Sequence, residues 1–337
     1  MKRFLGALAL IVGLVSLSAD TSALELPEGI QEQISVDISP RNPGPNENVT
    51  ITVRSFSSNL NGAVISWFVN EQLLVNERGA TSFSLTTGDV GTQTEVLVRI
   101  NKAEGGEIAR IITFAPADLE LVFEPLTFTP PFYEGRSVFT HQAPYKVVAI
   151  PRFIGMDGTR YSERDLVYTW RVNGRYVEGA GGLGGNVLSA EGALVSRPFD
   201  VSVDVQTPDG SMGAKKSVYI TPREPEIVLY ENHPLYGILY NNALDEFVDL
   251  RSGEKEKTLT AMPFFYGVDT PNQQDLTYNW TIDSRVVIMP SNENDLTVRI
   301  PDGEGLSGNN AIYVEARNAK NLLQASYSQL FVRFGTN

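Results

Sequence analysis

The chain has 337 residues, a formal net charge of −13, two histidines and no cysteine. The acidic balance disfavours binding to nucleic acid, because a surface of that sign repels a phosphate backbone. The lack of cysteine excludes disulfides and thiol catalysis, so each domain has to be stabilised by its apolar core.

The N-terminus has the pattern of a secretory signal peptide. Met1–Arg3 form a basic start, Phe4–Leu17 carry no charge over 14 residues, and the small residues of Thr21–Ala23 suit a signal peptidase. The alternative is a membrane anchor, but a spanning helix needs about 20 apolar residues. We therefore expect a signal peptide over residues 1–23 and a linker over 24–33. The mature chain is expected to be extracytoplasmic, secreted or periplasmic at the cell surface, without a membrane span.

Three tryptophans sit in the same local frame and indicate an internal repeat. The three segments run Ile65–Asn70, Tyr168–Asn173 and Tyr278–Asp283, with each tryptophan in the third position. The tryptophans are separated by 103 and 110 residues (67 to 170 to 280), a period the size of a domain. The repeat predicts three domains, over residues 34–116, 117–222 and 223–337.

The second and third repeats are the closer pair. Ala149–Asp157 matches Ala261–Asp269 through the shared pattern Pro-x-Phe-x-Gly-x-Asp, and Asp165–Tyr168 matches Asp275–Tyr278. The first repeat lacks the Pro-x-Phe-x-Gly-x-Asp block. We infer that the second and third domains are duplicates and that the first is a distant relative.

Alternating apolar and polar residues predict β-strands on both sides of each tryptophan. In the tryptophan segment of repeat 2, Tyr168, Trp170 and Val172 point to one face, which is typical of a half-buried strand. A final hairpin closes each repeat, with Thr207–Gly210 as the turn in repeat 2. The predicted flanking strands comprise 49–53, 145–149 and 259–261 upstream, 96–100, 201–205 and 312–316 downstream, and 108–114, 218–220 and 330–334 at the end. Many short strands separated by turn signals predict an all-β chain of sandwiches.

The Tyr-x-Trp strand, its flanking strands and the final hairpin resemble bacterial immunoglobulin-like domains of the PKD type. The resemblance covers almost all of the mature chain and implies three tandem β-sandwich domains of an exported protein. It departs from that family after the tryptophan, where PKD domains continue into an Asp-Phe-Gly-Asp-Gly turn. This chain has Arg171–Gly174 and Thr281–Ser284 there.

The tryptophans are expected to be core residues rather than binding residues. In disulfide-bonded immunoglobulin domains the strand tryptophan packs on the inter-sheet bridge. Without cysteine, aliphatic side chains have to cover the indole, and the candidates in repeat 2 are Val147, Val203 and Val205. We expect Trp170→Ala to cost about 3–5 kcal/mol.

Catalytic residues are not apparent. His141 and His233 lie far apart in the sequence, away from any nucleophile motif, and are expected on the surface. Gly179–Gly184 matches G-x-G-x-x-G, but it follows a predicted sandwich strand instead of opening a helix, so we expect a flexible loop. No pair among the 40 acidic residues stands out as a glycosidase pair. No catalytic residue and no cofactor are predicted.

Two pairs of aspartates are the one candidate metal constellation. Asp157 and Asp165, and likewise Asp269 and Asp275, flank the loop that leads into the tryptophan strand. Paired carboxylates with backbone carbonyls could bind Ca²⁺. The alternative, which we favour, is that they form Asx turns or end in solvent.

Aromatic residues gather in two similar segments, Leu121–Val138 and Ile227–Leu244. Phe132 and Tyr133 lie in the first, and Tyr230, Leu235, Tyr236 and Tyr240 lie in the second. We favour packing between neighbouring domains over ligand capture, because exposed aromatic surface is unfavourable.

The function expected from the sequence is that of a non-enzymatic cell-envelope protein with a structural or interaction role, such as adhesion, scaffolding or spacing. The alternative is a glycan-binding accessory protein of the envelope. The expected partner is an envelope or extracellular protein or a glycan, not nucleic acid.

Overall fold

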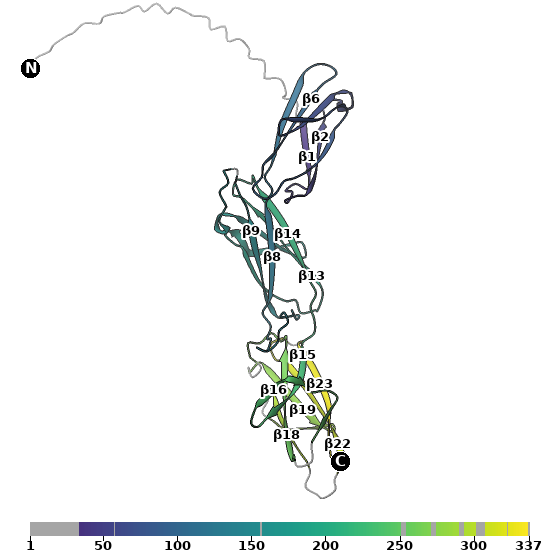
Figure 1. The fold of residues 1–337 in the computed structure, drawn as a ribbon, viewed down its shortest axis with the longest axis vertical. Helices are drawn as coiled ribbons and strands as arrows, with labels where there is room; N and C mark the ends of the chain where they lie inside the picture. Colours follow the sequence, from purple (N-terminus) through teal and green to yellow (C-terminus); the bar gives the residue numbers. More distant parts are fainter. Residues whose placement is uncertain are drawn as a thin grey trace, which may run out of the picture.

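The computed structural model describes residues 34–335, apart from 57, 156, 251–253, 271–273, 290–292, 301–306 and 322. The predicted signal peptide and linker therefore lie outside the described residues. Figure 1 shows three β-sandwiches that follow one another along the long axis. The predicted all-β, immunoglobulin-like fold class is confirmed, while the finer assignment to the PKD type stays a prediction. Nowhere in the described ranges is there a helix long and apolar enough to cross a membrane.

The first two sandwiches each pair a three-stranded with a four-stranded sheet. In the first, the sheet orders are β1-β2-β5 and β4-β3-β6-β7, and in the second they are β12-β9-β8 and β11-β10-β13-β14. The strands of the first sandwich are β1 (Ile34–Ser39), β2 (Asn48–Ser55), β3 (Val64–Val69), β4 (Gln72–Arg78), β5 (Ser82–Thr86), β6 (Thr94–Asn101) and β7 (Glu107–Phe114). Those of the second are β8 (Asp118–Pro125), β9 (Pro144–Arg152), β10 (Val167–Val172), β11 (Arg175–Leu183), β12 (Val187–Glu191), β13 (Phe199–Gln206) and β14 (Gly213–Ile220).

The third sandwich has the same plan with one more strand in each of its two sheets. Its sheet orders are β16-β15-β18-β21 and β17-β23-β22-β19-β20, and β17 runs parallel to β23. The strands are β15 (Glu226–His233), β16 (Gly237–Ala243), β17 (Phe247–Asp249), β18 (Glu256–Phe264), β19 (Leu276–Ile282), β20 (Arg285–Val286), β21 (Asp295–Arg299), β22 (Gly308–Asn318) and β23 (Ala325–Phe334). Two 3₁₀ turns, Leu60–Gly62 and Glu163–Asp165, complete the regular structure of the described residues.

Each tryptophan lies on a central strand of the larger sheet and is buried in its own core. The neighbouring strand places a valine directly opposite: Val98 for Trp67, Val203 for Trp170 and Val314 for Trp280. The predicted flanking strands are confirmed, because β2, β9 and β18 lie upstream, β6, β13 and β22 downstream, and β7, β14 and β23 close each repeat.

The expected aliphatic cover of the indole is wrong for the first sandwich. There the Phe83 ring stacks on Trp67, with centroids 5.3 Å apart and planes at 19°. Phe83 lies on β5, whose alternating side chains enter the core from the opposite sheet. The repeated sequence motif does not specify which side chain covers the indole ring. The covering strand β5 belongs to the opposite sheet and is not hydrogen-bonded to the tryptophan strand.

A turn three residues after each tryptophan is built the same way in all three sandwiches. Asn70, Asn173 and Asp283 have φ of 46°, 50° and 46°, and the residue that follows each also has positive φ. Two consecutive left-handed residues make the tight hairpin turn that suits twisted strands. Each of the three donates its backbone N–H to a carbonyl on the other neighbour of the tryptophan strand, which is β6, β13 or β22. Its side-chain oxygen accepts the backbone N–H of the same residue: Glu95, Asp200 or Ala311.

The second and third sandwiches are joined by both backbone and aromatic contacts. The Phe128 N–H donates to the Tyr266 carbonyl, and the Phe265 N–H donates to the Phe128 carbonyl, each at 2.7 Å. The Phe132 ring stacks on Tyr240 at 4.0 Å and meets Tyr230 edge-on at 5.6 Å. The predicted interdomain packing of aromatic residues is thus confirmed at this joint.

The same prediction is wrong for the tip of the β15–β16 hairpin. Leu235 is 81% exposed and Tyr236 is 77% exposed. β15 and β16 are part of the four-stranded sheet of the third sandwich, and the turn between them projects beyond the β15–β18 pairing, which ends at Asn232.

Candidate functional site

The four candidate calcium ligands make contacts of other kinds. The Asp157 carboxylate accepts the Thr159 N–H and hydroxyl, both at 2.9 Å, which is an Asx turn. These hydrogen bonds hold the pKa of Asp157 below its usual value. Asp165 ends the Glu163–Asp165 3₁₀ turn, with its N–H donating to the Ser162 carbonyl at 3.0 Å.

The equivalent aspartates of the third sandwich are Asp269 and Asp275. The Asp275 carboxylate pairs with the Lys320 ammonium at 2.5 Å, so a cation already occupies it, whereas Asp269 lies exposed in the loop that precedes β19. Within the described ranges, no three His, Asp or Glu side chains gather as a metal site would require. The Asx-turn alternative is the one observed at Asp157, and calcium binding stays an untested hypothesis for the set.

The expectation that both histidines lie on the surface is wrong for His141, which is only 3% exposed. Its ring lies at the joint between the second and third sandwiches, where its backbone carbonyl accepts the Gln324 amide at 2.8 Å. His233 ends β15, accepts the Leu235 N–H at 3.1 Å and stacks on Tyr236. Interdomain contact buries His141, and a local sequence pattern carries no information about that contact.

The glycine run is a strand rather than the predicted flexible loop. Residues 179–183 belong to β11, the edge strand beside β10. Gly179, Gly181 and Gly182 all have positive φ, and the pairing with β10 shifts register between Tyr176 and Gly181. A β-carbon at Gly181 would lie 2.4 Å from the Tyr168 carbonyl oxygen. Glycine is needed because the backbones approach closely there, which is a structural role.

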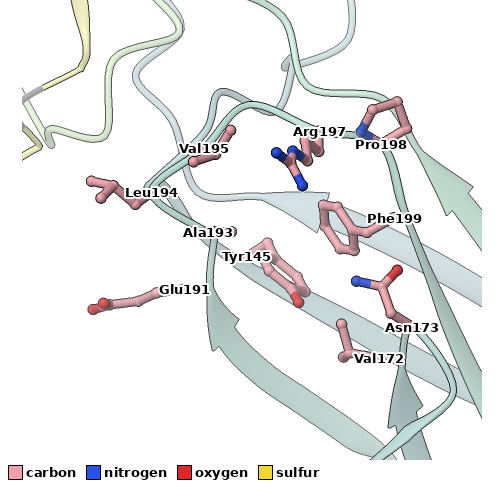
Figure 2. A pocket seen from close by; sticks show the side chains of 11 residues that line it. Tyr145, Val172, Asn173, Glu191, Ala193, Leu194, Val195, Arg197, Pro198 and Phe199 are labelled. Atoms are coloured by element: carbon pink, nitrogen blue, oxygen red, sulfur yellow. The ribbon is translucent and has the colours of Figure 1, made fainter.

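A pocket of about 550 Å³ opens at the end of the second sandwich that faces the third (Figure 2). Tyr145 at the start of β9 and Phe199 at the start of β13 form its floor, and residues 191–198 after β12 form one wall. The remaining lining residues are Val172, Asn173, Glu191, Gly192, Ala193, Leu194, Val195, Arg197 and Pro198. A volume of 300–1,000 Å³ with apolar walls and a few polar groups is typical of a ligand site.

The floor of this pocket is held rigidly by other aromatic side chains. Tyr145 and Phe199 lie 5.5 Å apart, and both contact Phe139 edge-on, at 5.4 and 5.6 Å. Burial raises the pKa of Tyr145, so its hydroxyl stays protonated. The sequence did not reveal this site, although the exposed apolar run Ala193–Val195 followed by Arg197 is a signal that could have pointed to it.

A second hollow, of about 670 Å³, shares Val172 and Asn173 with the pocket and continues along residues 175–178 of β11. β11 is the outermost strand of its sheet, so the hollow follows an unpaired edge among the described residues. Together the two hollows flank the β10–β11 turn.

Comparison of the sequence with known protein families and with curated proteins finds no match. Solved structures that match this chain include the fibronectin(III)-like modules of CbhA from Clostridium thermocellum, at 12% identity and a TM-score of 0.28, covering 57% of this chain and 94% of that chain. They also include the central fibronectin-III array of RIM-binding protein, at 13% identity and a TM-score of 0.30, covering 89% of this chain and 95% of that chain. The Bacteroides ovatus protein SGBP-B, in complex with a mixed-linkage heptasaccharide, has 12% identity and a TM-score of 0.19, covering 90% of this chain and 71% of that chain. The first two of these structures are named as fibronectin-III modules, and the sandwich assignment rests on this chain's own strands.

Proposed function

We propose that this chain is an exported, non-enzymatic protein of the cell envelope whose sandwiches act as a spacer and interaction scaffold. The observation that carries the proposal is the joint between the second and third sandwiches. There Phe128 exchanges backbone hydrogen bonds with Tyr266 and Phe265, and Phe132 packs into an aromatic cluster of the third sandwich. The Gln324 side-chain amide also donates a hydrogen bond to the His141 carbonyl. A joint with both apolar and polar contacts favours two domains that keep a fixed orientation.

The first joint is short and also restrained. Only residues 115–117 separate β7 from β8, and Ala117 is buried in the core of the second sandwich. A β-carbon placed on Gly91 would lie 3.1 Å from the Ile154 side chain, so the two sandwiches are in contact there. A scaffold that presents a binding surface at a set distance benefits from connectors of this kind.

The non-enzymatic part of the proposal is supported by where the ionisable groups lie. His141 is buried against a joint, His233 stacks on a tyrosine at a hairpin tip, and the candidate aspartates make an Asx turn or an ion pair. These contacts stabilise structure and place none of these groups beside a nucleophile-and-base pair.

Two measurements test the proposal. Mass spectrometry of the protein from its own cells should find a chain that begins at Leu24 in the envelope or secreted fraction. Small-angle scattering of that mature chain should give the extended profile of three sandwiches in a row. An unprocessed chain in the cytoplasmic fraction would refute export, and a compact, isotropic profile would refute the spacer role.

A second candidate function, glycan binding, is favoured by one feature of the third sandwich. Tyr313 and Tyr327 stack on the face of β22 and β23, with centroids 5.6 Å apart, and Tyr327 is 70% exposed. A stacked aromatic pair with one exposed ring on the face of a sheet is suited to contact a sugar ring. Binding on a polysaccharide array that is lost with Tyr327→Ala would support this function, and an array without binding would reject it.

A further inference from the structure

The pocket of the second sandwich contains a cation that nothing in the described chain neutralises. Arg197 makes no ion pair or hydrogen bond with the described residues, and Figure 2 shows its side chain beside the Phe199 ring, over the pocket. Glu191 also lines the pocket, but its carboxylate is directed away from the floor in the same view. A guanidinium beside apolar walls is a strong donor to an anion of the ligand.

Asn173 adds a second donor whose direction is set by the fold. Its Oδ1 accepts the Asp200 N–H at 3.3 Å, so the amide NH₂ has to lie on the other side. Figure 2 shows the amide nitrogen of Asn173 on the side of Tyr145, within the pocket. The positive-φ turn that positions Asn173 is part of the β10–β11 hairpin, so this donor is in place before a ligand binds.

The rest of the lining selects against a sugar. Val172, Leu194, Val195 and Pro198 offer no side-chain hydrogen bonds, and a buried sugar would leave several of its hydroxyl groups unpaired. The floor instead suits an aromatic ring, because the Tyr145 and Phe199 rings are tilted by 45° to one another and an aromatic ring prefers offset or edge-on contact with other rings.

We propose that this pocket binds the C-terminal aromatic residue of a partner polypeptide. The ring of that residue rests on Tyr145 and Phe199, and its carboxylate accepts hydrogen bonds from Arg197 and the Asn173 amide. The adjoining hollow along residues 175–178 leaves space for the residues that precede it. The proposal deepens the interaction role proposed above and names the chemistry of one partner.

The site is specific to the second sandwich. The third sandwich has Asp283 at the position of Asn173, and a carboxylate there offers no donor and repels an anion. The first sandwich has Asn70 at that position, but a glutamate, Glu71, follows it where the second has Gly174.

The test uses the full mature chain with labelled methyl groups, observed by NMR. The probe is N-acetyl-L-tyrosine, which carries a C-terminal carboxylate; N-acetyl-L-tyrosinamide and glucuronic acid are the comparison ligands. We expect N-acetyl-L-tyrosine to shift the methyl signals of Val172, Leu194 and Val195. The amide should bind about tenfold more weakly, because it lacks the charge that Arg197 recognises.

Arg197→Gln should remove that tenfold preference while leaving the methyl spectrum of the free protein in place, because the side chain is exposed. Lys215→Gln, an exposed change on β14 of the same sandwich, is the matched control and should keep the preference. The proposal is overturned by an absence of shifts with both tyrosine probes, by equal affinity for acid and amide, or by glucuronic acid as the stronger ligand. None of these results changes N-terminal processing or the scattering profile, so they leave the spacer proposal to its own test.

Discussion

Replacing core tryptophans by phenylalanine distinguishes two sandwiches that share the same sequence motifs around the tryptophan strand. Trp170 and Trp280 are both buried on the central strand of the larger sheet. The Trp170 indole N–H donates to the Gly185 carbonyl at 2.9 Å, whereas the Trp280 indole N–H has no hydrogen-bond partner in the described part of the chain. The same substitution therefore removes a hydrogen bond in one sandwich and an unpaired donor in the other.

The two changes share one unfavourable contribution and differ in another. Both remove the same volume from a packed core, which costs about 1 kcal/mol if the neighbours do not relax. Trp170→Phe also leaves the Gly185 carbonyl unpaired, a further loss of about 1–3 kcal/mol. Trp280→Phe removes a buried N–H that had no hydrogen-bond partner among the described residues. The stability gained by removing it offsets the cost of the cavity that the substitution leaves. We therefore expect a loss of about 2–4 kcal/mol for Trp170→Phe and about 1 kcal/mol or less for Trp280→Phe.

Calorimetry of the mature chain measures the difference, with hydrogen exchange identifying the sandwich that unfolds in each transition. For a domain of this size, 1 kcal/mol corresponds to about 4–8 °C in Tm. Trp67→Phe is the internal control and should behave like Trp170→Phe, because the Trp67 N–H donates to the Ala80 carbonyl at 2.8 Å. Equal losses for Trp170→Phe and Trp280→Phe would show that the indole hydrogen bond contributes nothing, and the reasoning would fail.

Three more predictions concern the backbone, pH and the joint. Gly181→Ala should lower the stability of the second sandwich by more than 1 kcal/mol, because its β-carbon meets the Tyr168 carbonyl; Gly179→Ala, which also has positive φ but open space around it, should cost less in the same urea titration. Burial raises the pKa of Tyr168 and Tyr266 to about 12, above the unfolded value of 10, so the folded state retains their protons. Stability should be unaffected below about pH 10 and fall as pH rises toward 12, and a urea midpoint that does not fall there would contradict it. Phe132→Ala removes the ring that stacks on Tyr240 across the joint, so the second and third sandwiches should vary more in relative orientation. Small-angle scattering of the mature chain should then give a broader distribution of interatomic distances, while the melting temperature of the first sandwich stays unchanged.

Local pattern was enough to place most strands. Alternation of apolar and polar residues around Trp170 correctly predicts β10 and the strand β13 beside it. A half-buried strand needs one apolar and one polar face, whatever its place in the sheet. The tight turn at Thr207–Gly210 also follows from local chemistry, with Gly210 in the left-handed region and its N–H bonded to the Thr207 carbonyl. The same local approach failed at Gly179–Gly184, where the need for glycine arises from the approach of β10 and not from a loop.

The sequence by itself determined the three-fold repeat, the all-β class and the burial of the tryptophans, since each depends on residue types at short and regular spacing. Only the tertiary structure decided what those sandwiches offer to a partner. Tyr145, Asn173 and Arg197 come from three separate segments and meet only because β9 and β13 begin where β10 ends, on the same side of the sandwich. His141 is buried for a related reason, since a glutamine 183 positions later in the chain reaches its carbonyl. Contacts of this kind depend on how sheets and domains pack against one another. The alternation of apolar and polar residues along a strand is the same whether or not these contacts form, so it cannot predict them.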